Sequence, residues 1–366
     1  MSSKVYIKAV VYLLILISII LFYGSYCIAN ESDFVYVAFD QSMQLNDGKK
    51  TKDYILFEKL YETNIKSALE GINHCEPIPR VMHQIWLGPN PIPNAYIAAT
   101  EILKKHHPDW KYKLWRDEDV KNFNFPAKDL YEKAASYTEK SDILRYSILE
   151  KFGGVYTDIG YFSIKSLDFL NDHFTFYASV GPQYNINDKL QVISGIIAAS
   201  KNNQIIEATL EHIRDHWDEV EKEFAQDLDN NNIKLKKSTI VSLSLKRSMY
   251  PLKEEIINYI KNQDALYKNC IIVLPPTYLG MTERFRPLDF FYKLLSINHR
   301  KMYYSTPQKE TIAIKIRLQN KIVSNLSKYK YDAKIPFYKR IYYRIKYFCK
   351  SLIDKYYWDF ALKKHL

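Results

Sequence analysis

The sequence predicts an α/β fold. Three observations support this prediction: short apolar runs of strand length, patterns of helical period, and glycine or proline at the junctions between them. The runs of strand length are residues 81–87, 111–115, 155–158 and 271–274. The helical patterns cover residues 52–71, 94–105, 138–151, 201–225 and 251–262. Strands and helices that alternate along a chain build a sheet with helices packed on its faces.

The chain begins with a candidate membrane anchor at residues 1–30. Residues 9–29 carry no charge, and about 20 apolar residues are enough to span a bilayer as a helix. Lys4 and Lys8 precede this run and acidic residues follow it, which predicts a cytoplasmic N-terminus and a body on the far side of the membrane. A cleaved signal peptide is the alternative, because residues 27–29 have a small-x-small pattern. We favour the uncleaved anchor because the run exceeds the roughly 7–15 residues of a signal core.

Three further regions follow the anchor. Residues 31–75 are interpreted as a stem, with a helix over 52–71 that ends at Gly71. Residues 76–300 contain the alternating strands and helices of the main domain. Residues 301–366 form a basic tail, with apolar residues at three- or four-residue steps and Lys or Arg between them. Such a helix is suited to an anionic membrane surface, or it docks its apolar stripe on the body.

The distribution of charge excludes one class of function. The chain has a net charge of +11, of which residues 328–366 carry +8 and residues 1–327 carry +3. A nearly neutral body argues against a nucleic-acid-binding domain. The two ends of the chain indicate different sides of a membrane. The anchor predicts a lumenal, Golgi-like domain, whereas a basic tail favours the anionic cytoplasmic leaflet.

The cysteines do not form a framework. Cys27 lies in the anchor and Cys349 in the tail, so Cys75 and Cys270 are the pair that remains for a disulfide. No spacing of cysteine and histidine along the sequence resembles a zinc site.

Two strand ends outline one pocket. The first predicted strand delivers Trp86 and Gly88 to its carboxyl end, and the strand at residues 155–158 delivers Asp158. Ligands of open α/β sheets bind outside the carboxyl ends of the strands. The sequence therefore predicts a site of nucleotide size at this edge.

Three motifs carry a resemblance to a known family. They are IPRVMHQIWLG, HHPDWKYKLWRDEDV and SDILRYSILEKFGGVYTD. Their order and spacing over residues 77–170 resemble the sugar-transferase domain of glycosyltransferase family 32. That family includes yeast-type mannosyltransferases, α1,4-galactosyltransferases and capsule enzymes, and it shares the last motif with glucosylating bacterial toxins. The resemblance implies a GT-A fold, a Rossmann-like mixed sheet flanked by helices. It also implies transfer of a hexose, with retention, from a UDP- or GDP-linked sugar to a glycan, glycolipid or protein.

The resemblance assigns roles to residues that bind the donor. Trp86 would stack on the nucleobase, unless it only plugs the edge of the sheet. Asp142 would accept hydrogen bonds from ribose or sugar hydroxyls, with Ser141 as a weaker polar candidate beside it. Arg145 lies on the same face of the helix, where it would neutralise donor phosphate or orient Asp142. The alternative for Arg145 is an ordinary ion pair within the helix.

The end of the third motif completes the expected site. Gly153 and Gly154 let the chain turn tightly from helix to strand. Gly154 and Tyr156 are also candidates for donor binding, and Tyr156 is expected to pack behind the site. Asp158 corresponds to the first acid of the family's Asp-x-Asp motif, a catalytic residue and a ligand for Mn²⁺ or Mg²⁺. Such an ion assists departure of the nucleoside diphosphate.

The second acid of the Asp-x-Asp motif is absent, because residue 160 is glycine. Three interpretations follow. Asp158 holds a metal ion with water and phosphate oxygens, or Arg145 or a lysine screens the leaving group without a metal. In the third, the chain binds a nucleotide sugar or glycan without transferring it. On the acceptor side, residues 191–203 resemble the segment that lines the acceptor cleft, which makes Ser194 and Gly195 weak candidates.

Overall fold

The computed structural model describes residues 34, 36–39, 50–72, 75–163, 165–181, 190–225, 237–262, 270–279, 282–283 and 312–316. The predicted anchor at residues 9–29 and the basic segment at 328–366 lie outside these ranges. Within them, no helix combines the length and the apolar character that crossing a membrane requires.

A six-stranded mixed sheet forms the centre of the fold, with the strand order β2-β1-β3-β6-β5-β7. Its strands are β1 (Val81–Ile85), β2 (Lys111–Trp115), β3 (Gly154–Thr157), β5 (Phe176–Val180), β6 (Val192–Ala199) and β7 (Ile271–Leu274). β6 runs antiparallel to β3 and to β5, while the other neighbouring pairs are parallel. The predicted α/β class and the predicted mixed sheet are confirmed.

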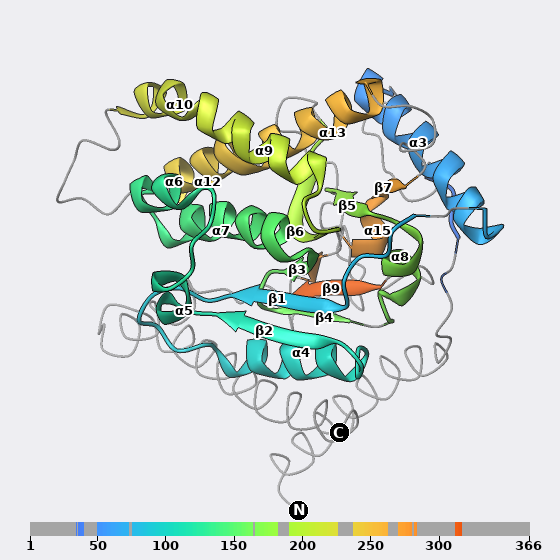
Figure 1. The fold of residues 1–366 in the computed structure, drawn as a ribbon, viewed down its shortest axis with the longest axis horizontal. Coiled ribbons are helices and arrows are strands. Elements are labelled where there is room, and N and C mark those ends of the chain that lie inside the picture. Colours follow the sequence, from blue (N-terminus) through green and yellow to red (C-terminus); the bar gives the residue numbers. More distant parts are fainter. Residues whose placement is uncertain are drawn as a thin grey trace, which may run out of the picture. The chain divides into compact units, whose positions relative to one another are not determined.

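Helices cover both faces of this sheet (Figure 1). The main ones are α3 (Lys52–Leu69), α4 (Asn94–Lys105), α7 (Tyr137–Phe152), α9 (Gln204–Asp215), α10 (Trp217–Glu223), α12 (Lys237–Ser244) and α13 (Tyr250–Asn262). On β1, Gln84 faces α4, where its Oε1 accepts a hydrogen bond from Thr100 at 2.9 Å. The next side chain back, His83, faces the end of α7, with its ring 6.3 Å from that of Phe152. Alternate residues of one strand thus meet helices on opposite faces.

The junction between α7 and β3 requires Gly153 and Gly154, as the sequence predicts. Ser136 caps the start of α7 by accepting a hydrogen bond from the Glu139 amide at 3.2 Å. At the other end Gly153 has φ +64° and Gly154 has φ +98°. A Cβ on Gly154 would lie 2.6 Å from the Val81 carbonyl oxygen. β3 therefore approaches β1 at a distance that only glycine allows.

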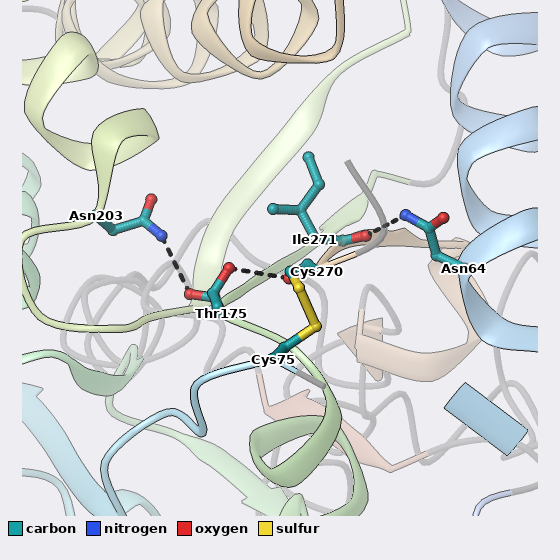
Figure 2. Close-up of a disulfide and its surroundings, with 6 residues drawn as sticks. All are labelled: Asn64, Cys75, Thr175, Asn203, Cys270 and Ile271. Atoms are coloured by element: carbon teal, nitrogen blue, oxygen red, sulfur yellow. Dashed lines mark hydrogen bonds between the residues drawn. A yellow bond between two sulfur atoms is a disulfide. The ribbon is translucent and has the colours of Figure 1, made fainter. Parts of the chain in front are cut away.

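A disulfide joins the stem to the edge of the sheet. Cys75 and Cys270 are bonded with their Cα atoms 5.5 Å apart, which confirms the predicted pairing (Figure 2). Beside it, the Asn64 side chain of α3 donates to the Ile271 carbonyl at 2.7 Å, and Thr175 Oγ1 donates to the Cys270 carbonyl at 3.0 Å. The helix of the predicted stem thus packs on edge strand β7 and satisfies part of its backbone.

Two smaller features lie next to the strand ends. A three-stranded sheet has the order β4-β9-β8, formed by β4 (Tyr161–Ser163), β8 (Thr282–Glu283) and β9 (Ala313–Ile316). α12 continues without a break into the π-helix η1 (Leu245–Met249) and then into α13. The sequence pattern predicts only the last of these three helical segments.

Candidate functional site

The turn after β3 fixes the position of Asp158. Asp158 directly follows the strand, and its amide donates to the Gly195 carbonyl of β6 at 2.7 Å. Its own carbonyl accepts a hydrogen bond from the Tyr161 amide at 3.3 Å, which closes a β-turn over residues 158–161. The Asp158 side chain is 23% exposed. A half-buried carboxylate therefore stands at the carboxyl end of a central strand, as predicted.

Arg145 joins three elements around this carboxylate. Its side chain, on α7, is only 7% exposed. Nη2 donates to Asp142 Oδ1 at 2.5 Å and lies 3.6 Å from Asp158 Oδ1. Nη1 donates to both the carbonyl and the hydroxyl of Ser194 on β6, each at 2.6 Å. One guanidinium thus links α7, the end of β3 and β6.

Asp142 is a buried carboxylate that accepts a hydrogen bond from Arg145. Its Oδ1 accepts from Arg145, and its Oδ2 accepts a hydrogen bond from the Ser244 hydroxyl of α12 at 2.5 Å. Burial raises the pKa of Asp142, while Arg145 and Ser244 favour its charged form. Both carboxylate oxygens have protein partners, so Asp142 orients the guanidinium in this structure.

Tyr156 lies behind Asp158, as predicted. Its hydroxyl donates to Asp158 Oδ1 at 2.9 Å, and the Arg145 guanidinium lies 4.6 Å from the centre of its ring. Burial raises the pKa of Tyr156 well above its usual value of 10, against the opposing effect of Arg145. The phenol therefore keeps its proton at neutral pH and remains a donor to Asp158.

The charges of this cluster are unequal. With both acids ionised, Asp142 and Asp158 outnumber Arg145 by one negative charge. Burial lowers the pKa of Arg145, but the neighbouring groups, Tyr156 and Asp142 first, outweigh burial and raise it. Among the described contacts, the buried Nε of Arg145 has no hydrogen-bond partner. Arg145 is thus a permanent cation beneath a half-exposed carboxylate.

Trp86 lies at the same edge of the sheet. It follows β1, and its ring nitrogen donates to the Asn90 carbonyl at 2.7 Å. The Trp86 ring is half-buried and meets the ring of Tyr96 edge to face, with centroids 6.3 Å apart. Tyr96 also contacts the turn after β3, because a Cβ on Gly160 would lie 2.7 Å from its ring. The aromatic pair therefore connects the end of β1 to the turn that carries Asp158.

The same geometry accounts for the missing second acid. Gly160 has φ +97°, a backbone conformation that glycine accepts and other residues rarely adopt. A side chain at this position would also run into the Tyr96 ring. Within the described ranges, no group of three or more His, Cys, Asp or Glu side chains is arranged to hold a metal ion. The residues present do not fit the two-acid metal site that the resemblance implies.

Two predicted site residues lie apart from this cluster. The Ser141 hydroxyl donates to the Tyr137 carbonyl one turn back at 2.7 Å, so it is bonded to its own helix. Gly154 begins β3 and is buried against β1, at the opposite end of the strand from Asp158. The weak acceptor-side candidates, Ser194 and Gly195, instead contact Arg145 and the Asp158 backbone.

Sequence reasoning missed two residues of the site. Ser244 lies 102 residues beyond Asp142 in the chain, in a segment where the sequence analysis predicted no element. Tyr96 belongs to a predicted helix, but nothing in its pattern indicates that its ring meets residue 160. Both contacts depend on tertiary packing, and no local motif announces them.

Comparison with known proteins shows that part of the chain is similar to glycosyltransferases. Residues 93–177 match the family model described as a glycosyltransferase sugar-binding region containing a DXD motif. Inositol phosphoceramide mannosyltransferase 3 of Schizosaccharomyces pombe is 32% identical over 124 residues, which cover 31% of this chain and 35% of that protein. An uncharacterised glycosyltransferase of Acanthamoeba polyphaga mimivirus is 31% identical over 138 residues, covering 36% of this chain and 53% of that protein. The chain thus spans about a third to a half of the length of these relatives.

One solved structure with some likeness to the chain is named as a glycosyltransferase domain. The UDP-bound glycosyltransferase domain from the YGT toxin has a TM-score of 0.37 and 12% sequence identity. The alignment covers 77% of this chain and 91% of that domain.

Proposed function

We propose that the chain is a membrane-anchored retaining hexosyltransferase of GT-A fold, from the premise that residues 93–177 match a glycosyltransferase sugar-binding region containing a DXD motif. Its donor is a UDP- or GDP-linked sugar. The observation that carries the proposal is the convergence of Arg145, Asp142 and Asp158 at the carboxyl edge of the sheet. Trp86 stands at the end of β1, the strand that pairs directly with β3.

Each residue has a physical role in donor binding. Trp86 stacks on the nucleobase, which contributes about 1–3 kcal/mol for an aromatic face. Asp158 accepts hydrogen bonds from hydroxyls of the ribose or the sugar. Arg145 supplies a fixed positive charge next to the diphosphate as it leaves with the electrons of the broken glycosidic bond. Asp142, Ser194 and Tyr156 hold these two groups in place.

The proposed reaction either uses a divalent metal ion or relies on protein side chains alone. A divalent ion of the kind used in this family, Mn²⁺ or Mg²⁺, stabilises negative charge on a leaving diphosphate. The described residues offer Asp158 without a second acid, so the roles above are assigned to protein side chains alone. Donor binding measured in EDTA and in Mn²⁺ tests this assignment.

The acceptor is proposed to be a glycolipid. The name of the S. pombe relative indicates an inositol phosphoceramide acceptor for that protein, which supports a lipid-linked acceptor here. An enzyme with a membrane anchor also meets such an acceptor in two dimensions at the bilayer surface. Glycan and protein acceptors are the alternatives for the same assay.

The domain is proposed to lie on the lumenal side of a membrane, with the N-terminus cytoplasmic. The charge asymmetry around residues 9–29 supports this orientation. The Cys75–Cys270 disulfide supports it independently, because such bonds persist in oxidising compartments and are rare in the cytosol. Protection of residues 50–279 from protease in sealed membranes, with a mobility shift on reduction, is the expected result. Digestion of the domain in sealed vesicles contradicts this location.

The full-length protein in detergent micelles tests the activity. The expected result is release of nucleoside diphosphate from one donor of a panel of UDP-glucose, UDP-galactose and GDP-mannose. Transfer of the labelled sugar to inositol phosphoceramide, a free glycan or a peptide then identifies the acceptor class. If no donor is consumed or bound with or without Mn²⁺, the proposed function is wrong.

A second function is favoured by one observation. Gly160 stands where the family has an acid, so a chain that binds a nucleotide sugar or glycan without transferring it fits the same site. The two functions differ in one measurement: the binding protein is stabilised by a donor against heat, yet it releases no nucleoside diphosphate in the presence of acceptor.

A further inference from the structure

We propose that Ser244 is a positioning residue of the donor site, which fixes Asp142 and, through Asp142, the guanidinium of Arg145. The consequence for donor binding rests on the proposed function. The contact itself stands on the geometry of the protein, because the Ser244 hydroxyl donates to Asp142 Oδ2 at 2.5 Å.

The segment that contains Ser244 is bonded to α7 at three places. Besides the contact of Ser244 with Asp142, the Tyr146 hydroxyl of α7 lies 3.1 Å from both the carbonyl and the hydroxyl oxygen of Ser248. Arg247 Nη1 of η1 pairs with Glu139 Oε1 of α7 at 2.6 Å. Ser244 therefore contacts Asp142 from a segment that is also held at Glu139 and Tyr146, one before and one after Asp142 on α7.

The orientation of Asp142 depends on both of its partners. A buried carboxylate is stable when each oxygen accepts a hydrogen bond. Arg145 occupies Oδ1, and Ser244 occupies Oδ2. Without the hydroxyl, Oδ2 is left buried and unpaired, and rotation of the carboxylate toward Arg145 is the available compensation. That rotation moves the guanidinium away from its contacts with Ser194 and Asp158.

The backbone at this point has an unusual form. The π-helix η1 begins directly after Ser244 and ends at Met249. π-helical turns are rare in proteins, and those that occur often lie at functional sites. Here the turn carries Arg247 and Ser248, the two other residues that bond α7. The irregular turn thus presents Arg247 and Ser248 to the helix that carries Asp142 and Arg145, and Ser244 stands directly before it.

The first test needs no ligand. Asp142 faces Arg145 and Glu139 on its own helix, Ser244 from α12 and Asp158 from the end of β3. The Ser244 hydroxyl stabilises charged Asp142 and not its protonated form. Ser244→Ala is therefore expected to unfold at lower urea concentration than wild type near neutral pH. This difference shrinks as the pH falls and Asp142 takes up a proton.

Two variants make this result specific. Ser244→Thr keeps the hydroxyl and is expected to restore the wild-type pH dependence. Ser242→Ala is the matched control, since residue 242 lies on another face of α12, and its stability difference from wild type is expected to be the same at every pH. If Ser244→Ala differs from wild type by the same amount across the pH range, Ser244 does not hold the Asp142 carboxylate and the proposal is wrong.

The second test measures the effect on the site. Ser244→Ala is expected to bind the donor about 10-fold more weakly, the size of a lost hydrogen bond to a charged group, with Ser244→Thr restoring the affinity. Equal affinity of Ser244→Ala and wild type overturns the positioning role. If wild type itself binds no donor, the proposed function fails, and the pH dependence of unfolding still decides whether Ser244 fixes Asp142.

Discussion

Arg145 and Arg247 are two buried arginines with similar partners. Each pairs with a carboxylate of α7, Arg145 with Asp142 at 2.5 Å and Arg247 with Glu139 at 2.6 Å. Each guanidinium also lies over an aromatic ring, at 4.6 Å and 3.7 Å. Within the described part of the chain, the Nε of each lacks a hydrogen-bond partner.

The two arginines differ in the second acid that they meet. Arg145 faces Asp158, a half-buried carboxylate at the carboxyl end of a central strand. Arg247 faces Glu221, which is 52% exposed on the surface helix α10. A buried ion pair is therefore not a sign of a binding site by itself. The strand end next to Arg145, where ligands of open α/β sheets bind, is the feature that the Arg247 pair lacks.

The largest expected effect concerns Arg247. Arg247→Met leaves the Glu139 carboxylate buried without its partner, which is expected to lower the free energy of unfolding by about 3–5 kcal/mol. Urea unfolding at neutral pH measures this loss. The matched control is Arg214→Met, which removes an exposed pair with Asp129 and is expected to cost less than about 1 kcal/mol. Equal losses in the two variants would mean that burial of the Arg247 pair has no energetic consequence.

A buried histidine is expected to contribute to the acid sensitivity of the fold. Burial lowers the pKa of His83 to about 4, below its unfolded value near 6.5. The unfolded chain therefore binds a proton that the folded chain refuses, and stability falls as the pH drops from about 6.5 to about 4, by roughly 3 kcal/mol in total. His83→Gln is expected to flatten this part of the unfolding curve. If the pH dependence of unfolding is the same in His83→Gln as in wild type, other groups cause the acid sensitivity.

Asp158 provides the sharpest test of the difference between the two arginines. Asp158→Asn keeps an acceptor for the Tyr156 hydroxyl and removes the charge, so donor turnover is expected to fall about 100-fold. Asp172→Asn is the control, because Asp172 forms an exposed ion pair with Arg80. Arg80 directly precedes β1, so this pair lies at the opposite end of that strand from Trp86. Turnover of Asp158→Asn at the rate of the control would show that the carboxylate beside Arg145 takes no part in the reaction.

The smallest expected effect separates backbone strain from crowding at residue 160. Gly160→Asp forces a side chain into a positive φ and against Tyr96, with an expected loss of about 1–3 kcal/mol in unfolding free energy. Gly71→Asp is the matched control, since Gly71 has φ +68° with nothing within 4 Å of an added Cβ. In the Tyr96→Gly background, the excess loss of Gly160→Asp over Gly71→Asp is expected to disappear. A stable Gly160→Asp enzyme with a new dependence on Mn²⁺ would refute this explanation for the missing acid.

Much of the fold was predictable because its signals are local. The strand at Ile271–Leu274 and the helix at Asn94–Lys105 match their predicted bounds. A hydrophobic period or a glycine stop acts over a few residues and survives in any tertiary context. The strands β5 and β6 were not predicted, because Ser179 in β5 and Ser194 and Gly195 in β6 interrupt the apolar runs by which the other buried strands were found.

The sequence by itself determined the α/β class, the motifs that resemble glycosyltransferases, the pairing of Cys75 with Cys270 and the position of Asp158 at a strand end. These depend on residue types at short spacing, or on the small number of cysteines. Only the tertiary structure decided that Ser194 and Ser244 complete the Arg145 cluster and that Tyr96 stands against Gly160. Such contacts join residues far apart in the chain, and their partners are set by how helices pack on the sheet, which no short stretch of sequence encodes.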